Sequence, residues 1–465
     1  AMIHAPEFMP ELIRRYDGAG PRYTSYPTAP AFSSHFGAER LLKSIRESNE
    51  DPIPRALSLY AHIPFCFSPC FYCGCNRIIS RDSTRKKSYL EQLLREIRLL
   101  APLFDRDRDV VQLHLGGGTP NSLDTAQLSE LMDQFACSFR FAAERDRDFS
   151  IEIDPRTVDP ADMAVLRTIG FNRVSLGVQD FDAQVQLAIN RRQDTSRIRD
   201  IHAACRESRF SSINFDLIYG LPLQTEDSFA ATLDTVSSIR PDRIALYSYA
   251  HMPELFKAQK KIDADSLPSP ESKLNLFRIA VQTLLAQGYV HIGMDHFALP
   301  GDELTRALES GDLHRNFMGY TTRRQTDLIG FGVSAISQIA DCYAQNAKDI
   351  STWGACVDSG KPATVRGLCT DRDDRIRAEV IQAIMCQGAL RFRDIETRFD
   401  IDFDGYFNHE LAGLPELAED GLLAVDADGL QVLPAGRLLL RAIAARFDAY
   451  LPGRPRAAAP LLKAQ

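Results

Sequence analysis

Four cysteines lie close together near the N-terminal end of the chain. Cys66, Cys70 and Cys73 follow a C-x3-C-x2-C spacing, and Cys75 comes two residues later. One loop with this spacing can present three thiolates to a small metal centre, and thiolates bind either zinc or an iron–sulfur cluster. A closed structural zinc site normally takes further ligands from a second pair, and no second pair follows. The spacing therefore favours a [4Fe–4S] cluster with one iron left open, and a structural zinc site is the alternative.

The cysteines follow directly after the first of a series of expected β-strands. Strands are expected at 57–62, 110–115, 149–153, 173–178, 213–218, 243–249 and 289–292. Amphipathic helices are expected between them, at 87–100, 125–137, 196–207, 228–239 and 272–287. This alternation implies a parallel sheet with right-handed crossovers. The predicted fold class is α/β, a partial (β/α)6-type TIM-like barrel.

Polar residues and glycines recur at the carboxyl ends of these strands, where barrels of this class place their chemistry. A glycine-rich turn, 116–120, follows the second strand, and Glu152 and Asp154 close the third. Gln179 closes the fourth strand, and Asp216 lies in the fifth. The repeated placement predicts one site at this end of the barrel. A helix cap or a satisfied core carboxylate is the alternative for Glu152 and Asp216.

Four regions are expected along the chain. Residues 1–50 form an N-terminal extension at the barrel mouth, 51–300 the barrel, 301–368 an irregular connection covering it, and 369–465 a C-terminal domain. In the last region helices are expected at 375–386, 391–399, 410–420 and 435–450, with a β-hairpin within 421–434. Helices with a hairpin suggest a winged-helix-like module.

Composition limits the possible partners and location. The 465 residues are 45% hydrophobic and 25% charged, with a net charge of −8, which argues against a nucleic-acid partner. No apolar run is long enough for a membrane span, and no secretory signal is visible, so we expect a cytoplasmic protein. The six scattered cysteines are expected to be reduced and buried.

The cysteine spacing after a first barrel strand resembles that of the radical S-adenosylmethionine enzymes. Gly116-Gly117-Gly118-Thr119-Pro120 is similar to the glycine-rich turn of that superfamily. The resemblance implies that the open iron binds S-adenosylmethionine. An electron from the cluster then cleaves it to methionine and a 5′-deoxyadenosyl radical.

Other segments resemble one family within this superfamily, the oxygen-independent coproporphyrinogen III oxidases, over about residues 10 to 450. They are PRYTSYP at 21–27, CGCN at 73–76, VQDF at 178–181, DLIYGLP at 216–222, GMDHF at 293–297 and HRNFMGYTT at 314–322. The resemblance implies oxidative decarboxylation of two propionate side chains of coproporphyrinogen III to vinyl groups, giving protoporphyrinogen IX. It also implies two bound S-adenosylmethionine molecules and a reduced electron donor such as flavodoxin or ferredoxin. We expect a monomer.

The resemblance also implies roles for individual residues. Cys66, Cys70 and Cys73 would hold the cluster, whereas Cys75 would be catalytic without binding iron. Tyr72 would lie near the adenine. Residues matching the cluster-bound S-adenosylmethionine site are Tyr60, Gly117, Glu152 and Ile336. Those matching the second site are Gln179, Arg191, Asp216 and Ala250, with backbone near Gly118 and Thr119.

Three of the remaining interpretations have simple alternatives. Tyr60 and His62 are predicted to be catalytic, although His62 could be a packed loop histidine. Arg191 could belong to a solvated charged run. Arg22 could meet substrate propionates or lie in a plain turn.

Two other functions compete with the oxidase. One is a haem-binding chaperone of the same fold without decarboxylase activity. Such relatives usually lack the PRYTSYP segment and a cysteine equivalent to Cys75, and both are present here. The other is a radical methyltransferase acting on a different substrate.

Overall fold

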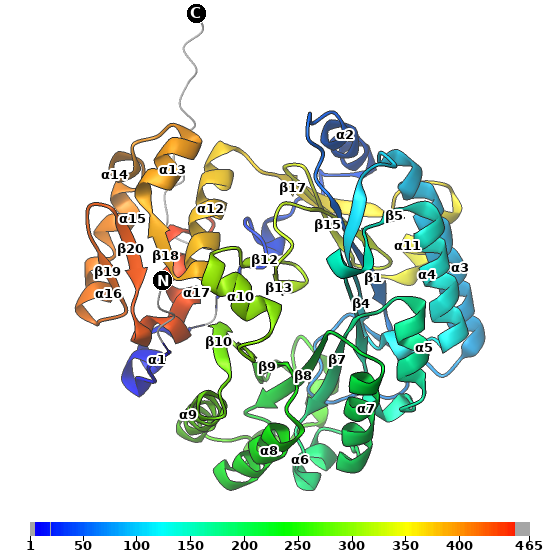
Figure 1. The fold of residues 1–465 in the computed structure, drawn as a ribbon, viewed down its shortest axis with the longest axis horizontal. Helices are drawn as coiled ribbons and strands as arrows, with labels where there is room; N and C mark the ends of the chain where they lie inside the picture. The colour runs from blue at the N-terminus through cyan, green and yellow to red at the C-terminus, as the bar shows by residue number, and fades with distance from the viewer. Residues whose placement is uncertain (1–4, 19, 452–465) are drawn as a thin grey trace, which may run out of the picture.

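The computed structural model of the chain describes residues 5–18 and 20–451. Its centre is a sheet in which six successive strands pair in parallel (Figure 1). They are β1 (Leu57–Ile63), β4 (Asp109–Gly117), β6 (Asp148–Ile153), β7 (Arg173–Gln179), β8 (Ser212–Tyr219) and β9 (Arg243–Ser248). The ends of the sheet do not pair with each other among the described residues, so the barrel is partial. The predicted α/β fold class is confirmed.

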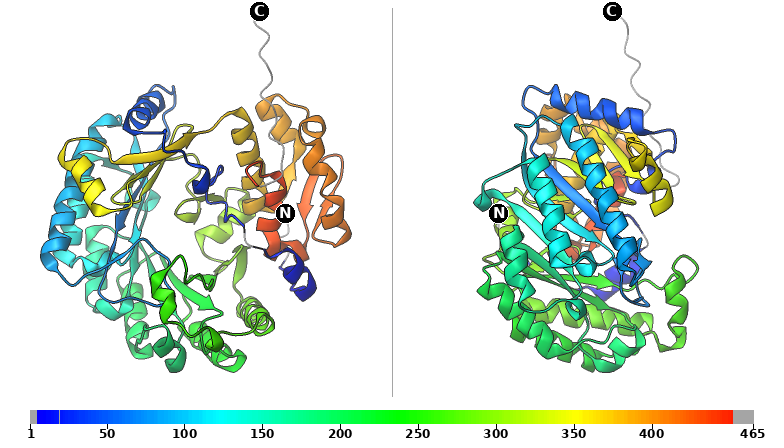
Figure 2. Two further views of the ribbon diagram at one scale, coloured as in Figure 1. Left: turned by 180° about the vertical axis from the view of Figure 1, so that it is seen from behind. Right: turned by 90° about the vertical axis from the view of Figure 1, so that its right-hand side faces the viewer.

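Helices cover the outer face of this sheet (Figures 1 and 2). They are α3 (Ser83–Leu100), α4 (Thr125–Ser138), α5 (Asp162–Ile169), α6 (Ala183–Ala188), α7 (Thr195–Glu207), α8 (Glu226–Ile239) and α9 (Pro270–Ala286). In α3, Leu93 and Ile97 lie on the buried face, as their spacing predicts. Asp82 begins this helix by accepting hydrogen bonds from two backbone amides, and Asp124 begins α4 with a capping box. The helices thus start where local sequence caps them.

The region 301–368, predicted to be irregular, is mostly regular, so that prediction is wrong. After β10 (Val290–Gly293) and β11 (His296–Ala298) come α10 (Glu303–Ser310) and the hairpin of β12 (His314–Asn316) and β13 (Gly319–Thr321). Then β14 (Asp327–Phe331) pairs in parallel with β1. Three more strands then extend the sheet, each antiparallel to the one before it: β15 (Ile336–Ile339), β16 (Cys342–Asn346) and, after α11 (Ile350–Asp358), β17 (Thr364–Cys369).

Buried polar residues hid these strands from sequence analysis. Gln345 and Asn346 end β16 and are buried, so the strand lacks an apolar–polar alternation. Asn346 donates to Glu96 Oε1 of α3 at 2.8 Å and to the carbonyl of Gly332 at 2.9 Å. Such tertiary partners are invisible in a sequence window.

The scattered cysteines also differ from expectation. Cys342 and Cys369 are directly opposite each other in the register of β16 and β17, and they form a disulfide. Cys137 is exposed. The predicted reduced state is therefore wrong for Cys342 and Cys369, and the predicted burial is wrong for Cys137 and for the half-buried Cys356. Cys205 and Cys386 are free and buried, as predicted.

The C-terminal part has its own hydrophobic core and lies beside the sheet (Figure 2). It contains α12 (Arg372–Gln387), α13 (Phe392–Phe399), α14 (Phe403–Tyr406), α15 (Asn408–Ala412), α16 (Pro415–Glu419) and α17 (Leu440–Ala444). A small sheet pairs β20 (Gly429–Val432) with both β18 (Ala389–Arg391) and β19 (Leu423–Val425).

Two predicted helices of this part are broken. The span 410–420 divides into α15 and α16, because Pro415 has no amide hydrogen to continue α15. The span 435–450 consists of α17 between two 3-10 helices, Pro434–Leu439 and Ala445–Phe447. No described helix is both long and apolar enough to span a membrane.

The N-terminal segment joins the two parts. It contains α1 (Pro10–Tyr16) and α2 (Ala38–Asn49). Tyr23 and Tyr26 are buried in the C-terminal core, and the Tyr23 hydroxyl donates to Asp448 at 2.9 Å. Helix α2 contacts β15, β16 and β17 of the main sheet. Arg22, which directly precedes Tyr23, is thereby held near Asp295, with which it forms an ion pair.

A buried ion pair ties α2, β4 and β14 together. Arg108 donates to Asp327 at 2.5 Å, and both side chains are about 1% exposed. The same guanidinium donates to Ser48 Oγ at 2.9 Å and to the carbonyl of Arg55 at 2.9 Å. The second carboxylate oxygen of Asp327 accepts from the amide of Ala340.

We predict that Asp327→Ala lowers the free energy of unfolding by about 3–5 kcal/mol, because it leaves a buried guanidinium without its counter-ion. Chemical denaturation followed by circular dichroism measures this. Glu47→Ala is the matched control, since it removes an exposed pair with Lys43 and should cost less than about 1 kcal/mol. Equal losses in the two variants would contradict the prediction.

Candidate active site

The cysteine loop leaves the end of β1 and folds back beside it. Strand β2 (Phe65–Cys66) pairs with β3 (Ile78–Ile79) on the far side of the loop. The amide of Ser80 donates to the carbonyl of Cys66 at 3.0 Å, so both ends of the loop are held together. Cys66 and Cys70 are buried, Cys73 is half-buried and Cys75 is exposed. The loop therefore begins and ends at the carboxyl end of the first barrel strand.

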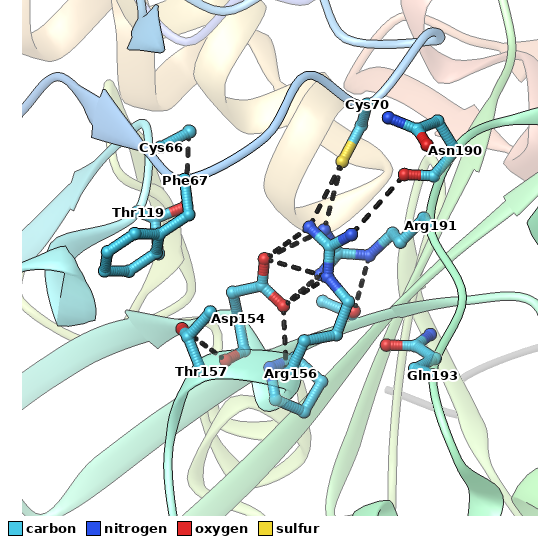
Figure 3. A network of polar contacts seen from close by, with 12 residues as sticks. Cys66, Phe67, Cys70, Thr119, Asp154, Arg156, Thr157, Asn190, Arg191 and Gln193 are labelled. Carbon is cyan, nitrogen blue, oxygen red and sulfur yellow. Dashed lines mark hydrogen bonds and ion pairs between the residues drawn. The ribbon is translucent and has the colours of Figure 1, made fainter. Parts of the chain in front are cut away.

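Polar donors lie against the first two thiols (Figure 3). The Cys66 sulfur is 3.3 Å from Thr119 Oγ1. The Cys70 sulfur accepts from Arg191 Nη1 at 3.3 Å and from Arg156 Nη2 at 3.6 Å. Cations and hydroxyl groups near sulfur favour the thiolate, which is the form that binds metal.

The surroundings of Cys73 also favour its thiolate. A hydrogen bond from Cys75 and the nearby Arg77 guanidinium together lower the pKa of Cys73 to about 5, against the opposing effect of burial. Burial instead raises the pKa of Cys66 to about 11. A metal centre would compensate this, because a bound metal keeps a coordinating thiol deprotonated.

The arrangement fits a cluster better than a single ion. Among the described residues, no three His, Cys, Asp or Glu side chains converge closely enough to hold one metal ion. A [4Fe–4S] cluster takes each thiolate at a different iron, so its ligands stand farther apart than those of a mononuclear zinc site. Cys66, Cys70 and Cys73 share one loop and influence one another electrostatically. These residues therefore fit a cluster.

The glycine-rich turn at the end of β4 has no room for side chains. Gly117 has φ of +118°, and a Cβ there would lie 2.8 Å from the His62 ring. A Cβ on Gly118 would lie 2.7 Å from the carbonyl oxygen of Pro64. The turn therefore packs tightly against the strand that leads into the cysteine loop. The amide of Gly117 donates to Glu152 at 3.3 Å, which brings the end of β6 to the same place.

Hydrogen bonds determine the tautomer of His62. Its Nε2 lies 2.9 Å from the carbonyl oxygen of Asn76, which can only accept, so Nε2 carries the proton. Nδ1 then accepts from the Tyr60 hydroxyl at 3.0 Å. Burial lowers the pKa of His62, so the ring is neutral at pH 7. His62 thus joins β1 to the segment that follows Cys75.

A cavity of about 360 Å³ opens at this end of the sheet. Four residues predicted from sequence line it, namely Tyr60, His62, Glu152 and Ile336. The remaining lining includes residues that were not in the predicted site, among them Tyr247, His296, Arg315 and Phe317. The structure therefore brings together side chains from β1, β6, β9, β12 and β15.

A second group of predicted residues gathers at the ends of β7 and β8. Gly177 pairs with Asp216 in the register of these strands. A Cβ on Gly177 would meet Arg191 Nη2 at 2.8 Å and Gln179 Nε2 at 3.0 Å, so both side chains lie over this glycine. Asp216 accepts from Ser175 at 3.0 Å and from Asn214 at 2.9 Å.

Arg191 is buried and does not belong to a solvated run, although its neighbour Arg192 is exposed. It donates to the carbonyl of Gly177 at 2.6 Å and lies 3.4 Å from Asp154, which also binds Arg156 (Figure 3). Asp154 and the two arginines therefore link the cysteine loop to the second group.

Tyr72 and Ala250 are brought together by a residue that sequence analysis missed. Gln259 donates from Nε2 to the carbonyls of Tyr72, at 3.0 Å, and Ala250, at 3.2 Å. Arg156 was also missed. The contacts that bring them to the site are distant in sequence: Gln259 reaches Tyr72 across 187 positions, and Arg156 reaches Cys70 across 86.

Comparison with known proteins agrees with this geometry. Residues 60–236 match the Radical SAM superfamily, and residues 370–439 match the HemN C-terminal domain. The chain is 50% identical over 446 residues to the oxygen-independent coproporphyrinogen III oxidase of Pseudomonas aeruginosa, covering 96% of each chain. The corresponding protein of Synechocystis sp. is 43% identical, with 97% of each chain covered. The chain belongs to the oxygen-independent coproporphyrinogen III oxidase family.

A solved structure supports the same assignment. Coproporphyrinogen III oxidase (HemN) from Escherichia coli, described as a radical SAM enzyme, matches with a TM-score of 0.91 and 46% identity. The match covers 96% of this chain and all of that one. The resemblance of this chain to the oxygen-independent coproporphyrinogen III oxidases is thus confirmed over nearly its whole length. The oxidase is supported over the haem-binding chaperone.

The carboxyl group of Asp216 should make the free energy of unfolding depend on pH. Burial raises the pKa of Asp216 from 3.8 to about 7, and nearby Glu152 adds to the shift. Asp216 is therefore protonated in the folded protein, but ionised in the unfolded chain, across this window. Its contribution to stability is present at about pH 4 and is lost as the pH rises to about 7.

We predict that Asp216→Asn removes this dependence, because the amide does not titrate. Relative to wild type, the free energy of unfolding of the variant should rise by roughly 2–4 kcal/mol between acidic and neutral pH. Urea denaturation of the apoprotein across this pH range measures it. Parallel pH profiles for the two proteins would contradict the prediction.

Proposed function

We propose that this chain catalyses the oxidative decarboxylation of two propionate side chains of coproporphyrinogen III to vinyl groups, giving protoporphyrinogen IX. The observation that carries the proposal is the joint placement of a three-cysteine loop and a cavity at one end of the sheet. A propionate β-carbon offers no acidic hydrogen, so acid–base catalysis cannot activate it and a cofactor must. When bound, the [4Fe–4S] cluster and S-adenosylmethionine supply a carbon-centred radical able to remove this hydrogen.

In this proposal Cys66, Cys70 and Cys73 hold the cluster. The cluster-bound S-adenosylmethionine contacts Tyr60, Tyr72, Gly117, Glu152 and Ile336. Three of these residues line the cavity, and the amide of Gly117 is hydrogen-bonded to Glu152. The glycine turn lets the end of β4 pack directly against His62 and Pro64, which lead from β1 into the cysteine loop.

A second S-adenosylmethionine is proposed at the neighbouring group. Its residues are Gln179, Arg191, Asp216 and Ala250, with backbone near Gly118 and Thr119. The buried guanidinium of Arg191 lies over Gly177, which pairs with Asp216 in the strand register, so a cation and a carboxyl group lie near one another. The oxygen Oε1 of Gln179 is buried without a hydrogen-bond partner among the described residues, so it is available to a ligand donor.

His62 and Cys75 complete the proposed machinery. His62 orients the Tyr60 hydroxyl from one ring nitrogen and holds the chain after Cys75 with the other. The amide of Cys75 donates to the Cys73 sulfur at 3.4 Å, which places Cys75 beside the cluster without using its thiol as a ligand.

We further propose a monomeric cytoplasmic protein that receives its electron from a reduced donor such as flavodoxin or ferredoxin. Eight free cysteines suit a reducing compartment, with the Cys342–Cys369 bond as the exception. The proposed regions remain 1–50, 51–300, 301–368 and 369–465. Two separate hydrophobic cores support a division between barrel and C-terminal domain.

The test is anaerobic incubation of the cluster-loaded protein with coproporphyrinogen III, S-adenosylmethionine and a reductant. We expect protoporphyrinogen IX, carbon dioxide, methionine and 5′-deoxyadenosine. Tight haem binding without this product would favour the chaperone. Formation of S-adenosylhomocysteine with a methylated product would favour a methyltransferase.

Single cysteine variants test the ligand assignment. Cys66→Ser, Cys70→Ser and Cys73→Ser should each lose most of the iron, because the protein supplies only three thiolate ligands and each variant leaves two. Cys75→Ser should keep its iron and lose activity. Iron content and activity of the reconstituted proteins measure this, with Cys137→Ser on the exposed side of α4 as the control. Full iron content in Cys70→Ser would overturn the assignment.

A further inference from the structure

One cation at the cavity wall has no counter-ion. Arg315 lies on β12, lines the cavity, and is only 2% exposed. Among the described residues, no carboxylate lies within 4.0 Å of its guanidinium nitrogens, and Nη1 has no hydrogen-bond partner. A buried charge without a partner is costly, so such a group normally serves a ligand or a metal-bound anion.

The contacts that Arg315 does make hold it in place without neutralising it. Its Nε donates to the carbonyl of Arg22 at 3.2 Å. Its guanidinium stacks over the ring of Tyr320, 4.5 Å from the centroid. Gln382 donates to its backbone carbonyl at 2.7 Å. The side chain is therefore oriented in advance, with hydrogen-bonding capacity to spare.

The nearest acidic group is already engaged. Asp295 forms an ion pair with Arg22, whose guanidinium also lies over the ring of Tyr247. His296, beside Asp295, adds no positive charge at neutral pH, because burial lowers its pKa. Two arginines therefore face one carboxylate at this part of the wall, and one positive charge remains.

We propose that Arg315 forms the centre of a carboxylate-binding subsite that holds one propionate of the porphyrinogen substrate. The inference rests on the proposed function. Carboxylates are the only ionised groups of a porphyrinogen, and a guanidinium binds them through paired hydrogen bonds. Phe317, Met318 and Ile336 line the same cavity and suit the apolar ring. Arg22 acts as a positioning residue, because its carbonyl orients Arg315 while Asp295 neutralises its own charge.

Arg22 is therefore not the arginine that faces the propionates. One of the two expectations for Arg22 was a contact between its guanidinium and the propionates, but the structure pairs that guanidinium with Asp295. The uncompensated charge sits on Arg315 instead, within the HRNFMGYTT segment. The carboxylate of S-adenosylmethionine is the other anion available to this site, and the test separates the two.

The test uses the cluster-loaded protein in wild-type, Arg315→Met and Arg315→Lys forms, with Arg324→Met as the control. Arg324 is a half-exposed arginine paired with Glu379 and lies outside the cavity. Two ligands are titrated separately by fluorescence or calorimetry. They are coproporphyrin III, the stable oxidised form of the substrate ring with the same propionates, and S-adenosylmethionine.

We expect Arg315→Met to weaken coproporphyrin III binding by about 10- to 100-fold, because a charge-assisted contact is lost. The coproporphyrin III affinity of Arg315→Lys should fall between those of Arg315→Met and wild type, because lysine keeps the positive charge but cannot form the paired hydrogen bonds of a guanidinium. S-adenosylmethionine affinity and the Arg324→Met control should not change. In turnover, KM for coproporphyrinogen III should rise more than kcat falls.

Several outcomes would overturn the inference. Unchanged coproporphyrin III affinity in folded Arg315→Met would do so, as would a selective loss of S-adenosylmethionine affinity. Circular dichroism reports folding, and if Arg315→Met does not fold, the same criteria apply to Arg315→Lys. Failure of the wild-type protein to convert coproporphyrinogen III would instead count against the proposed function, so the two failures are distinguishable.

Discussion

The site depends on the parallel register of β1 with its neighbours. In this register His62 lies opposite Gly116, and Ile63 opposite Gly117, so the strand leading to the cysteines ends beside the glycine turn. Parallel strands end at one edge of the sheet, and a shift by a single residue would turn each side chain to the other face. The cysteine loop, the glycine turn and Glu152 therefore meet because of strand pairing alone.

Two groups of charged side chains lie at the same edge of the sheet. On one side Asp154 pairs with two arginines that also donate to the Cys70 sulfur, so cations, carboxylate and thiol form one network. On the other side Asp295 compensates Arg22 but leaves Arg315 unpaired. The first network is suited to holding a cofactor-binding loop in place. The second leaves a charge that an anionic ligand can satisfy.

The C-terminal part contributes by fixing the N-terminal segment. Tyr23 and Tyr26 are buried in its core, which holds Arg22 against β10 and β11 through Asp295. Arg22 in turn positions Arg315 through its backbone carbonyl. Residues nearly 300 positions apart in the chain therefore depend on the same packing, and neither segment could form this wall alone.

Local pattern was enough to predict the six parallel strands and most of the helices between them, although α5 and α6 were missed. The cluster ligands stay a prediction. Strand and helix periods are short-range properties, and the three cysteines share one loop whose spacing limits what they can bind. The region 301–368 escaped prediction, because its strands bury polar residues such as Asn346 whose partners come from α3.

The sequence by itself determined the barrel, the spacing of the three cysteines and, through its motifs, the family. Only the tertiary structure decided that Cys342 pairs with Cys369, that Arg191 is buried beside Cys70, and that Arg315 rather than Arg22 keeps an uncompensated charge. The physical reason is the same in each case. The environment of a thiol or a guanidinium is set by groups that lie close in space, and strand pairing and domain packing bring those groups from distant parts of the chain.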